Sequence, residues 1–497
     1  MEHSPERELK LAATPDFRMP SIYGLVGPIV RQAPPERNET TYYDTDDLRL
    51  ARWGASLRHR PGEGWTVKLP AERDAPFLVR PEIVFEGNGG SPPPAAVELV
   101  RAFVRTEELH ESVRMTTLRR RTELHAADGQ LIGGVVDDAV SVHNGGTSAS
   151  GFRELEVEIG DEMTPALLDA LVERLRQAGA GAPEQTAKYI RALAPAAPLS
   201  PEIAVAELGP DASAGDVVQR ALGLSVIRLI RHDAVVRLDL DPEGVHQARV
   251  ATRRLRSDLR TFRPLVDREW STALRDELGW IARFLGEVRD GDVLLGRLRE
   301  KAGALPDELQ NAATTAISDL QASRDNALTT LLDALRSSRY VELLDRLVDA
   351  AAAPVLRDDA SAPAAGAIPA LVRRPWHKLE KRAGKLPEDP TNAQLHEIRI
   401  RTKRVRYGAE AAAPVAGKPA RAFAHAAARL QDVLGDLNDA DVAAGWLDTW
   451  AARAGAGEGA RAAEALADLE RDDAAGLRDR WRAAWDELAE PKLRAWM

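Results

Sequence analysis

Two segments in the second half of this 497-residue chain recur at a nearly constant distance along the sequence. Residues 246–256 (HQARVATRRLR) recur as residues 396–406 (HEIRIRTKRVR), 150 positions later. Residues 285–293 (LGEVRDGDV) recur as residues 434–442 (LGDLNDADV), 149 positions later. Two separate segments that return at nearly one offset indicate an internal duplication. We therefore expect two related helical bundles, packed about a pseudo-twofold axis.

Each copy of the first segment places basic side chains along one side of a helix. In the first copy they stand at steps of three and four, which forms a stripe: His246, Arg249, Arg253, Arg256 and Arg260. The second copy repeats the stripe: His396, Arg399, Lys403 and Arg406. We expect the two stripes to line a basic groove that binds a polyanion. A salt-bridged surface is the alternative, because Asp and Glu are abundant nearby.

The groove would be a local feature, since the net charge of the chain is -10. That charge argues against a general nucleic-acid binder held by overall charge. The two histidines are expected to donate to phosphate or to make ordinary helix contacts, because no second ligand completes a metal-binding spacing.

The N-terminal part shows alternating charges of the kind that a strand presents on one face. Glu6, Glu8 and Lys10 share a face, and 154–158 (ELEVE) repeats the pattern with three glutamates. Like charges at that spacing repel, and the usual neutralisers of several oxygen ligands are hard cations such as Mg²⁺ or Mn²⁺. An isolated run of this kind is more often a solvated strand face.

Basic residues alternate between those two acidic runs. Arg58 and Arg60 share a strand face, a turn containing glycine follows, and Lys68 stands on the next strand. Arg119 and Arg121 repeat the alternation before the turn at 128–129. Carboxylates that hold metal, together with cations that hold oxyanions, predict a site for a polyanion. The ordered set, more than any one run, favours this function.

The chain divides by pattern into a strand-rich part and a helical part. Residues 1 to about 160 predict short strands, interrupted by a helical stretch at 95–109; a helix is expected over 164–193, broken at 178–182. We expect an α+β protein with a first domain at 1–195, a linker at 196–215 and a helical domain at 216–497. The helical domain would have halves at about 216–350 and 371–497.

Composition limits the chemistry and the compartment. The absence of cysteine excludes disulfides and thiolate metal sites. No apolar run approaches the ~18 residues that a spanning helix needs, and the N-terminus is charged from Glu2. We expect a soluble cytoplasmic protein.

The first part resembles a CYTH domain, also called a triphosphate tunnel metalloenzyme. The motifs that match in order are Glu6-x-Glu8-x-Lys10, 42–45 (YYDT), Arg58-x-Arg60, 65–68 (WTVK), Asp137-Asp138, 154–158 and Lys188-Tyr189. The second part resembles a CHAD (conserved histidine α-helical) domain, with both His-x-x-Arg helices present. The resemblance implies an antiparallel eight-stranded β-tunnel barrel with flanking helices that grips a triphosphate. It also implies an all-α domain of two pseudo-symmetric helical bundles that binds inorganic polyphosphate.

The resemblance further implies an inorganic triphosphatase that uses Mg²⁺ or Mn²⁺. The catalytic residues would be Glu6, Glu8, Lys10, Arg58, Arg60 and Lys68. Arg119, Arg121 and Lys188 would also bind substrate, and the metal ligands would be Glu6, Glu8, Asp138, Glu154, Glu156 and Glu158. Which two of the three late glutamates ligate, and whether Asp137 or Asp138 does, stays open at this point.

Two alternatives remain. The enzyme could act on an organic triphosphate such as thiamine triphosphate or ATP, although no aromatic-rich segment accompanies the cationic strands. It could also be a non-catalytic polyphosphate-binding adaptor, which is favoured by Gly133-Gly134, where many CYTH relatives have an acidic residue. The expected partners are inorganic triphosphate and polyphosphate, with no specific nucleic acid and no membrane, and the expected location is the cytoplasm, in association with polyphosphate granules.

Overall fold

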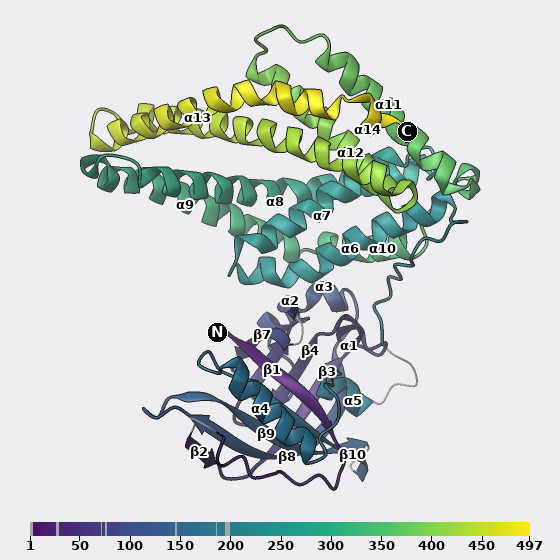
Figure 1. Cartoon of the computed structure of the whole chain (residues 1–497), viewed down its shortest axis with the longest axis vertical. Helices are drawn as coiled ribbons and strands as arrows, with labels where there is room; N and C mark the ends of the chain where they lie inside the picture. Colours follow the sequence, from purple (N-terminus) through teal and green to yellow (C-terminus); the bar gives the residue numbers. More distant parts are fainter. Residues whose placement is uncertain are drawn as a thin grey trace. The chain divides into compact units, whose positions relative to one another are not determined.

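The structure is a computed structural model that describes residues 3–25, 29–70, 72–74, 77–144, 147–184, 186–193 and 199–497. Within these ranges, the side chains of 3–7, 72–74, 77–80, 144 and 147–149 are outside the description. The chain forms two compact units, which we call the strand unit (Met1–Glu202) and the helical unit (Ile203–Met497) (Figure 1).

One antiparallel sheet forms the centre of the strand unit. Its ten strands in the described residues are β1 (His3–Ala13), β2 (Ile29–Gln32), β3 (Glu36–Asp44), β4 (Ser56–Arg60), β5 (Gly64–Lys68), β6 (Glu72–Asp74), β7 (Phe77–Phe85), β8 (His110–His125), β9 (Leu131–Asn144) and β10 (Thr147–Ile159). Gly129 turns the chain from β8 to β9 with φ +92°, a conformation that glycine adopts without strain.

The sheet closes on itself through its first strand. The pairing order is β1-β10-β9-β8-β3-β4-β5-β7, and β7 returns to β1. Residues 8–13 of β1 pair with β10, and residues 3–8 pair with β7. Eight strands thus form a closed circuit, and β2 and β6 attach to β8 and β7. Closure leaves the circuit without an unpaired edge. The predicted antiparallel eight-stranded barrel is confirmed.

Among the described residues of the strand unit, five short helices accompany the sheet. They are α1 (Arg49–Trp53), α2 (Pro94–Leu99), α3 (Arg101–Val104), α4 (Pro165–Gln177) and α5 (Lys188–Leu193). The helical stretch expected at 95–109 is therefore shorter than predicted. It divides at Val100 and ends at Arg105, which has a positive φ of 54°, before β8 begins.

Strands β1 and β10 are buried on both faces, and the faces differ in chemistry. Alternate apolar residues pack into one cluster with α4: Leu9, Leu11, Leu155, Val157, Leu171 and Leu175. The residues between them on the strands are charged. Because successive strand side chains point to opposite faces, α4 covers an apolar outer face and the charged face lines the interior.

An apolar cluster under α5 fills one end of the barrel interior. Tyr189 of α5 stacks on Tyr42 of β3, with ring centroids 4.7 Å apart and planes 5° apart. Both rings belong to a cluster with Met115 of β8 and with Val140 and Val142 of β9. Tyr189 Oη donates a 2.9 Å hydrogen bond to Asp44, which fixes α5 at this position.

The helical unit contains, in the described residues, nine α-helices and one 3₁₀ helix. They are α6 (Ala214–Leu238), α7 (Pro242–Thr261), α8 (Arg268–Ala302), α9 (Asp307–Arg336), α10 (Ser338–Ala352), η1 (Asp358–Ser361), α11 (Ala364–Ala383), α12 (Asn392–Ala454), α13 (Glu458–Leu488) and α14 (Pro491–Arg494). The predicted helical fold class of the C-terminal region is confirmed. Helix α8 packs along α9, and α12 packs along α13 (Figure 1).

The repeated segments begin at matching helix starts. Asp241 caps α7, and Thr391 caps α12 in a capping box with Gln394. Helix α12 contains a break at Gly417, where φ is 69° and ψ is -144°. Ile203, which falls inside the predicted linker, is buried in the helical unit beside α6.

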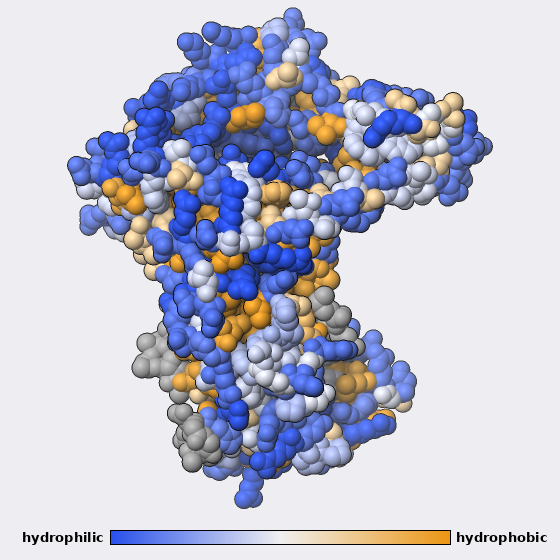
Figure 2. Space-filling model, turned by 180° about the vertical axis from the view of Figure 1, so that it is seen from behind, coloured by the Kyte–Doolittle hydropathy of each residue, from blue (hydrophilic) through white to orange (hydrophobic). Residues whose placement is uncertain are grey.

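Hydrophilic side chains cover most of the face of the helical unit that is shown in Figure 2, and apolar groups on it are small and scattered. In the described ranges, no helix is both long enough and apolar enough to span a membrane.

Candidate functional site

The strand register places the charged residues of the barrel on one common face. Directly opposed residues of an antiparallel pair share a face, and residues two apart on a strand share it too. Following the pairs round the circuit gives one interior set: Glu8, Lys10, Arg58, Arg60, Lys68, Glu82, Arg119, Arg121, Asp138, Glu154, Glu156 and Glu158. The acidic and basic residues expected from the sequence therefore share the inner face of the closed sheet. The backbone of Glu6 lies in β1, but its side chain is outside the described part.

Lys10 lies at the centre of a buried group of carboxylates. Its Nζ is 2.8 Å from Glu156 Oε1, 3.3 Å from Glu154 Oε1 and 3.3 Å from Glu8 Oε1. All four side chains are buried. Three carboxylates can stay close together here because an ammonium group lies between them.

Asp138 of β9 extends this group. It stands opposite Glu154 on one side and Arg119 on the other. Arg119 donates two hydrogen bonds to it, Nε to Oδ1 at 3.0 Å and Nη2 to Oδ2 at 2.7 Å. Lys188 of α5 also contacts Asp138 Oδ2 and lies 3.4 Å from Glu156.

Asp137 points to the other face of β9. Arg153 holds it with two hydrogen bonds of 2.7 Å, and the same guanidinium lies over the ring of Phe17, 5.5 Å from its centroid. Of the aspartate pair, only Asp138 thus faces the carboxylate group around Lys10.

The surroundings push the pKa values of the two central glutamates apart. Burial raises the pKa of Glu154. Burial alone would also raise the pKa of Glu156, but the charges of Lys10 and Lys188 outweigh it and hold that pKa well below its usual value. Burial opposes the charge of Lys10, yet Glu156, Glu8 and Glu154 raise its pKa well above the ordinary value. The group therefore consists of charges that stabilise one another.

Helix α5 supplies a second cation that the sequence patterns did not identify. Arg191 Nη1 is 3.3 Å from Glu154 Oε2, and its guanidinium stacks on Phe152, 4.3 Å from the ring centroid. It stands three residues after Lys188, so one face of α5 presents both cations to the carboxylates.

The remaining predicted cations of the barrel lie on β4, β5 and β8. Arg58 and Lys68 both pair with Glu82 of β7, with 3.9 Å between Arg58 Nη2 and the carboxylate. Arg60 Nη1 is 2.8 Å from Glu63. On β8, Arg121 Nη2 is 3.1 Å from Glu158 Oε1. These cations are all partly exposed, which leaves them accessible to an anion that enters the barrel.

The donor set suits a hard divalent cation in its chemistry. Glu8, Glu154 and Glu156 offer only carboxylate oxygens, which Mg²⁺ and Mn²⁺ prefer. Among the described side chains, no three acidic or histidine groups surround a common point that is clear for a metal. The ammonium groups of Lys10 and Lys188 lie there instead.

In the helical unit, the two His-x-x-Arg stripes meet in one cavity of about 550 Å³, which we call the histidine groove. From the stripes it contains His246, Arg249, Arg253, His396, Arg399 and Lys403. Arg289 and Arg297 of α8 also line it and were not predicted, although the repeated segment 285–293 indicated this region.

The groove contains acidic and amide groups as well as basic ones. Arg249 Nη1 is 2.6 Å from Asp290, and His396 Nδ1 is 2.6 Å from Asn438 Oδ1. The buried Nε atoms of Arg253 and Arg399 have no hydrogen-bond partner in the described part of the chain. Burial, followed by the charges of Arg399, Arg253 and Arg249, lowers the pKa of Lys403 to about 7. The groove thus holds more positive charge than its own carboxylates neutralise.

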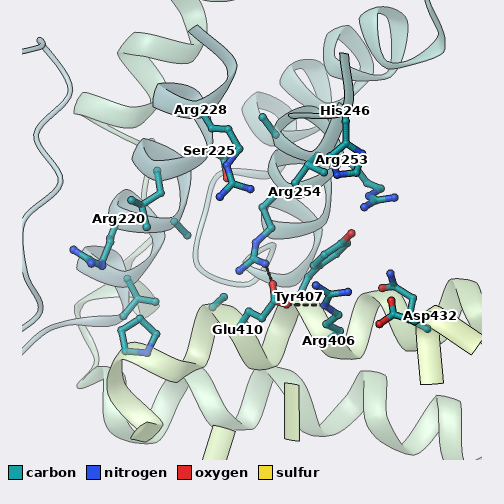
Figure 3. A pocket seen from close by; sticks show the side chains of 18 residues that line it. Arg220, Ser225, Arg228, His246, Arg253, Arg254, Arg406, Tyr407, Glu410 and Asp432 are labelled. Carbon is teal, nitrogen blue, oxygen red and sulfur yellow. Dashed lines mark hydrogen bonds and ion pairs between the residues drawn. The ribbon is translucent and has the colours of Figure 1, made fainter. Parts of the chain in front are cut away.

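The ends of the stripes lie in other places. Arg406 lines a neighbouring cavity of about 610 Å³, which we call the glutamate cavity (Figure 3). Arg260 lines a third cavity, and Arg256 lies beside Gly279 of α8. The nine residues predicted to bind polyphosphate therefore do not all line the same groove.

Comparisons with known proteins agree with this division of the chain. The family model for the CYTH domain matches residues 4–190, and the model for the CHAD domain matches residues 220–448. The uncharacterized protein MT2285 of Mycobacterium tuberculosis (strain CDC 1551 / Oshkosh) is 32% identical over 450 residues, which cover 85% of this chain and 84% of the relative.

Two solved structures resemble the chain more distantly. A CHAD domain from the plant Ricinus communis has 28% identity and a TM-score of 0.47, and the match covers 57% of this chain and 95% of that one. PptA from Streptomyces chartreusis has 22% identity and a TM-score of 0.47, and the match covers 55% of this chain and 100% of that one.

CYTH domains are typically hydrolases or cyclases that act on triphosphates, and they generally depend on Mg²⁺ or Mn²⁺. The barrel with a charged interior, the duplicated His-x-x-Arg helices, the two family matches and the relative with 32% identity lead to one conclusion: the chain belongs to the family of proteins in which a CYTH domain is followed by a CHAD domain.

Proposed function

We propose that the strand unit hydrolyses inorganic triphosphate inside its barrel, and that the helical unit binds inorganic polyphosphate in the histidine groove. The observation that supports the first part is the common inner face of the closed sheet, on which carboxylates and cations lie together. Triphosphate is a chain of negatively charged phosphate groups, and it loses hydrating water when a protein encloses it. Cations along its length must compensate for that loss.

The cations of the interior have the chemistry to bind and orient the phosphate chain. Arg58, Arg60 and Lys68 lie on β4 and β5, and Lys10, Arg119 and Lys188 lie around the carboxylates. Guanidinium groups match phosphate oxygens in pairs, while the ammonium groups act as compact point charges. A substrate held between the two groups has its charge neutralised from opposite walls. Lys10 and Lys188 would also stabilise the negative charge that develops on the leaving phosphate.

Glu8, Glu154, Glu156 and Asp138 would hold a divalent cation, together with Glu6 and Glu158. Such a cation, when bound, neutralises phosphate oxygens and makes a bound water more acidic. The protein contributes the placement of the carboxylates, and its cations hold the substrate in one orientation.

The aromatic residues of the described interior support an inorganic substrate. Tyr42 is covered by Tyr189, and Phe152 is covered by the guanidinium of Arg191. One face of each ring is thus already occupied by a side chain of α5, which limits the surface on which a nucleobase or a thiamine ring could stack. The described interior therefore favours phosphate recognition without an organic group.

The glycines that favoured the adaptor alternative have a structural explanation. A Cβ on Gly133 would lie 2.4 Å from the carbonyl oxygen of Glu158, and a Cβ on Gly134 would lie 2.7 Å from that of Thr122. Close strand packing thus requires glycine at both positions, whether or not the barrel is catalytic. Their presence does not favour the adaptor over the enzyme.

Phosphate release tests the catalytic proposal. Tripolyphosphate, ATP, thiamine triphosphate and long-chain polyphosphate are each supplied with and without Mg²⁺ or Mn²⁺. We expect metal-dependent turnover of tripolyphosphate that exceeds turnover of both organic triphosphates. Glu8→Gln combined with Glu6→Gln should abolish it, whereas Glu173→Gln on the exposed side of α4 should not.

Metal-dependent turnover of none of the four substrates would reject the enzyme and leave the adaptor. Preferred turnover of ATP or thiamine triphosphate would instead identify an organic substrate. Polyphosphate binding by the histidine groove is measured separately, so either part of the proposal can fail without the other.

A further inference from the structure

The glutamate cavity has a counterpart on the other side of the internal repeat. This third cavity has a volume of about 740 Å³, and we call it the arginine cavity. Eleven of its fourteen lining residues stand 150 positions from a residue that lines the glutamate cavity. Ser257 corresponds to Tyr407, and Pro264 corresponds to Pro414. The duplication has therefore produced two equivalent cavities, and their chemistry can be compared position by position.

Two arginines of the glutamate cavity are held by carboxylates. Arg254 donates a 3.2 Å hydrogen bond from Nε to the buried Asp258, and its Nη1 contacts Glu410. Arg406 Nε donates to the other oxygen of Glu410 at 2.7 Å. Figure 3 shows Glu410 between the two arginines. One carboxylate thus bridges two guanidinium groups.

The equivalent positions of the arginine cavity lack both carboxylates. Arg404 corresponds to Arg254, but Gly408 stands at the position of Asp258 and Arg260 at the position of Glu410. Burial, followed by the charges of Arg404 and Arg256, lowers the pKa of Arg260, so these guanidinium groups repel one another. Where the first cavity has an ion pair, the second has like charges.

The rest of the arginine cavity is also basic. Arg263, Arg268 and Arg357 line it near the α7–α8 connection and η1, and Arg374 and Lys378 line it from α11. In the described part of the chain no acidic residue lines this cavity, and Arg401 is the only one of its cations with a carboxylate partner, Glu397.

An unpartnered hydroxyl adds a second observation. The buried Oγ of Ser257 lines the arginine cavity and has no hydrogen-bond partner among the described residues. Buried polar atoms are nearly always hydrogen-bonded. An oxygen of a bound ligand could therefore accept the missing hydrogen bond from Ser257 Oγ.

We propose that the arginine cavity is a second anion site of the helical unit, and that it binds clustered phosphate groups. One phosphate lies between Arg260 and Arg404, in the place where the Glu410 carboxylate lies in the equivalent cavity. Guanidinium groups pair with phosphate oxygens in the same way as with carboxylate oxygens. The volume of the cavity falls in the range of small-molecule sites. This site is separate from the histidine groove and does not depend on catalysis in the barrel.

Arg260→Glu tests the proposal, because it recreates the arrangement of the equivalent cavity. The new carboxylate can pair with Arg404 and Arg256, so the variant should fold at least as stably as the natural protein. Binding of tripolyphosphate to the full chain is followed by titration calorimetry in the presence of a chelator. We expect the variant to bind one tripolyphosphate fewer. Arg461→Glu on α13 makes the same charge change at an exposed position and should bind the full number.

The opposite substitution, in the glutamate cavity, gives an independent test of the proposal. Glu410→Arg removes the internal carboxylate of the glutamate cavity and should add one tripolyphosphate site. Arg249→Ala with Arg399→Ala should weaken the histidine groove and leave the Arg260-dependent site intact, which separates failure of the groove from failure of this inference. Unchanged stoichiometry and affinity in folded Arg260→Glu would overturn the second site.

The source of the phosphate groups follows from the same titration. Weaker binding of ATP than of tripolyphosphate at the Arg260-dependent site identifies condensed inorganic phosphate as the ligand. Equal binding identifies any triphosphate group, including that of a nucleotide.

Discussion

Lys10 of β1 stands directly opposite Glu156 of β10 in the strand ladder, with 2.8 Å between Nζ and Oε1. Both side chains are buried, and Lys10 also contacts Glu8 and Glu154. Lys10 therefore holds three carboxylates together in a small volume, and we expect its ammonium group to contact a phosphate oxygen when substrate is bound.

Lys10→Met should remove both effects. The carboxylates lose the charge that separates them, and we expect the free energy of unfolding to fall by about 3–5 kcal/mol, as when one partner of a buried ion pair is deleted. Turnover of tripolyphosphate should fall by roughly 10²–10³, which is typical for the loss of one charge-stabilising donor. Urea denaturation and steady-state phosphate release measure the two quantities. Arg176→Met on the exposed side of α4 is the matched control. A near-normal rate in the Lys10 variant would remove this residue from the site.

The period-two pattern made the interior of the barrel predictable. Glu154, Glu156 and the apolar residues between them alternate on one strand, so their division between two faces follows from strand geometry. The closure of the barrel through β1 could not be predicted from this alternation. It depends on the pairing of residues 3–8 with β7, a segment about 75 positions away in the sequence. It was expected only from the family resemblance. Arg191 was missed because α5 has six residues, too few to show a stripe.

The duplicated helices show a different limit. The repeat predicted two related helical halves, and each stripe was read along its own helix. Arg260 was therefore assigned to the same groove as Arg249, although the two line different cavities. An alignment of the two copies places Arg260 at the position equivalent to Glu410, which is a reversal of charge. This reversal could be interpreted only when the structure had shown that both positions line equivalent cavities.

Tyr189→Phe should loosen α5 at the end of the barrel. Asp44 accepts hydrogen bonds from the backbone N–H groups of Thr45, Leu50 and Ala51, and the Tyr189 hydroxyl is its fourth donor. Its loss should cost about 1–3 kcal/mol of unfolding free energy, since a buried acceptor loses a partner. Because α5 also positions Lys188, we expect a higher KM for tripolyphosphate.

Chemical denaturation and substrate titration check this. Tyr23→Phe, at a residue that is 58% exposed, should change neither quantity. An unchanged KM in Tyr189→Phe would show that α5 does not depend on this hydrogen bond to place Lys188.

Arg249→Ala combined with Arg399→Ala should weaken binding of long-chain polyphosphate. Both residues line the histidine groove, one from each copy of the repeat. Binding that neutralises fewer phosphates also releases fewer counterions, so the salt dependence of the affinity should become shallower. Affinity at several salt concentrations measures both effects. Arg453→Ala combined with Arg461→Ala removes the same charge from exposed positions and serves as the control. Equal affinity and equal salt slopes in the two double variants would reject the groove.

Lys403 should make polyphosphate binding depend on pH near neutrality. Burial, together with Arg399, Arg253 and Arg249, lowers its pKa to about 7, and Asp439 opposes this only partly. A bound polyanion favours the charged ammonium, so binding takes up a proton and the affinity should fall as pH rises through about 7. In the free protein the sign is opposite. A base with a lowered pKa is more easily protonated in the unfolded chain, so its contribution to stability rises with pH from about 7 toward the ordinary value of 10.5.

Two variants separate Lys403 from the nearby His246, whose pKa is lowered first by burial and then by the charge of Arg289. Lys403→Met should remove the decrease in affinity between about pH 6 and about pH 8, and it should remove the linked proton uptake that calorimetry detects in buffers of different ionisation enthalpy. Lys403→Arg keeps the charge at both pH values, so it should bind as tightly at the higher pH as at the lower. A decrease that persists unchanged in Lys403→Met would assign the pH dependence to another titratable group of the groove and remove Lys403 from the explanation.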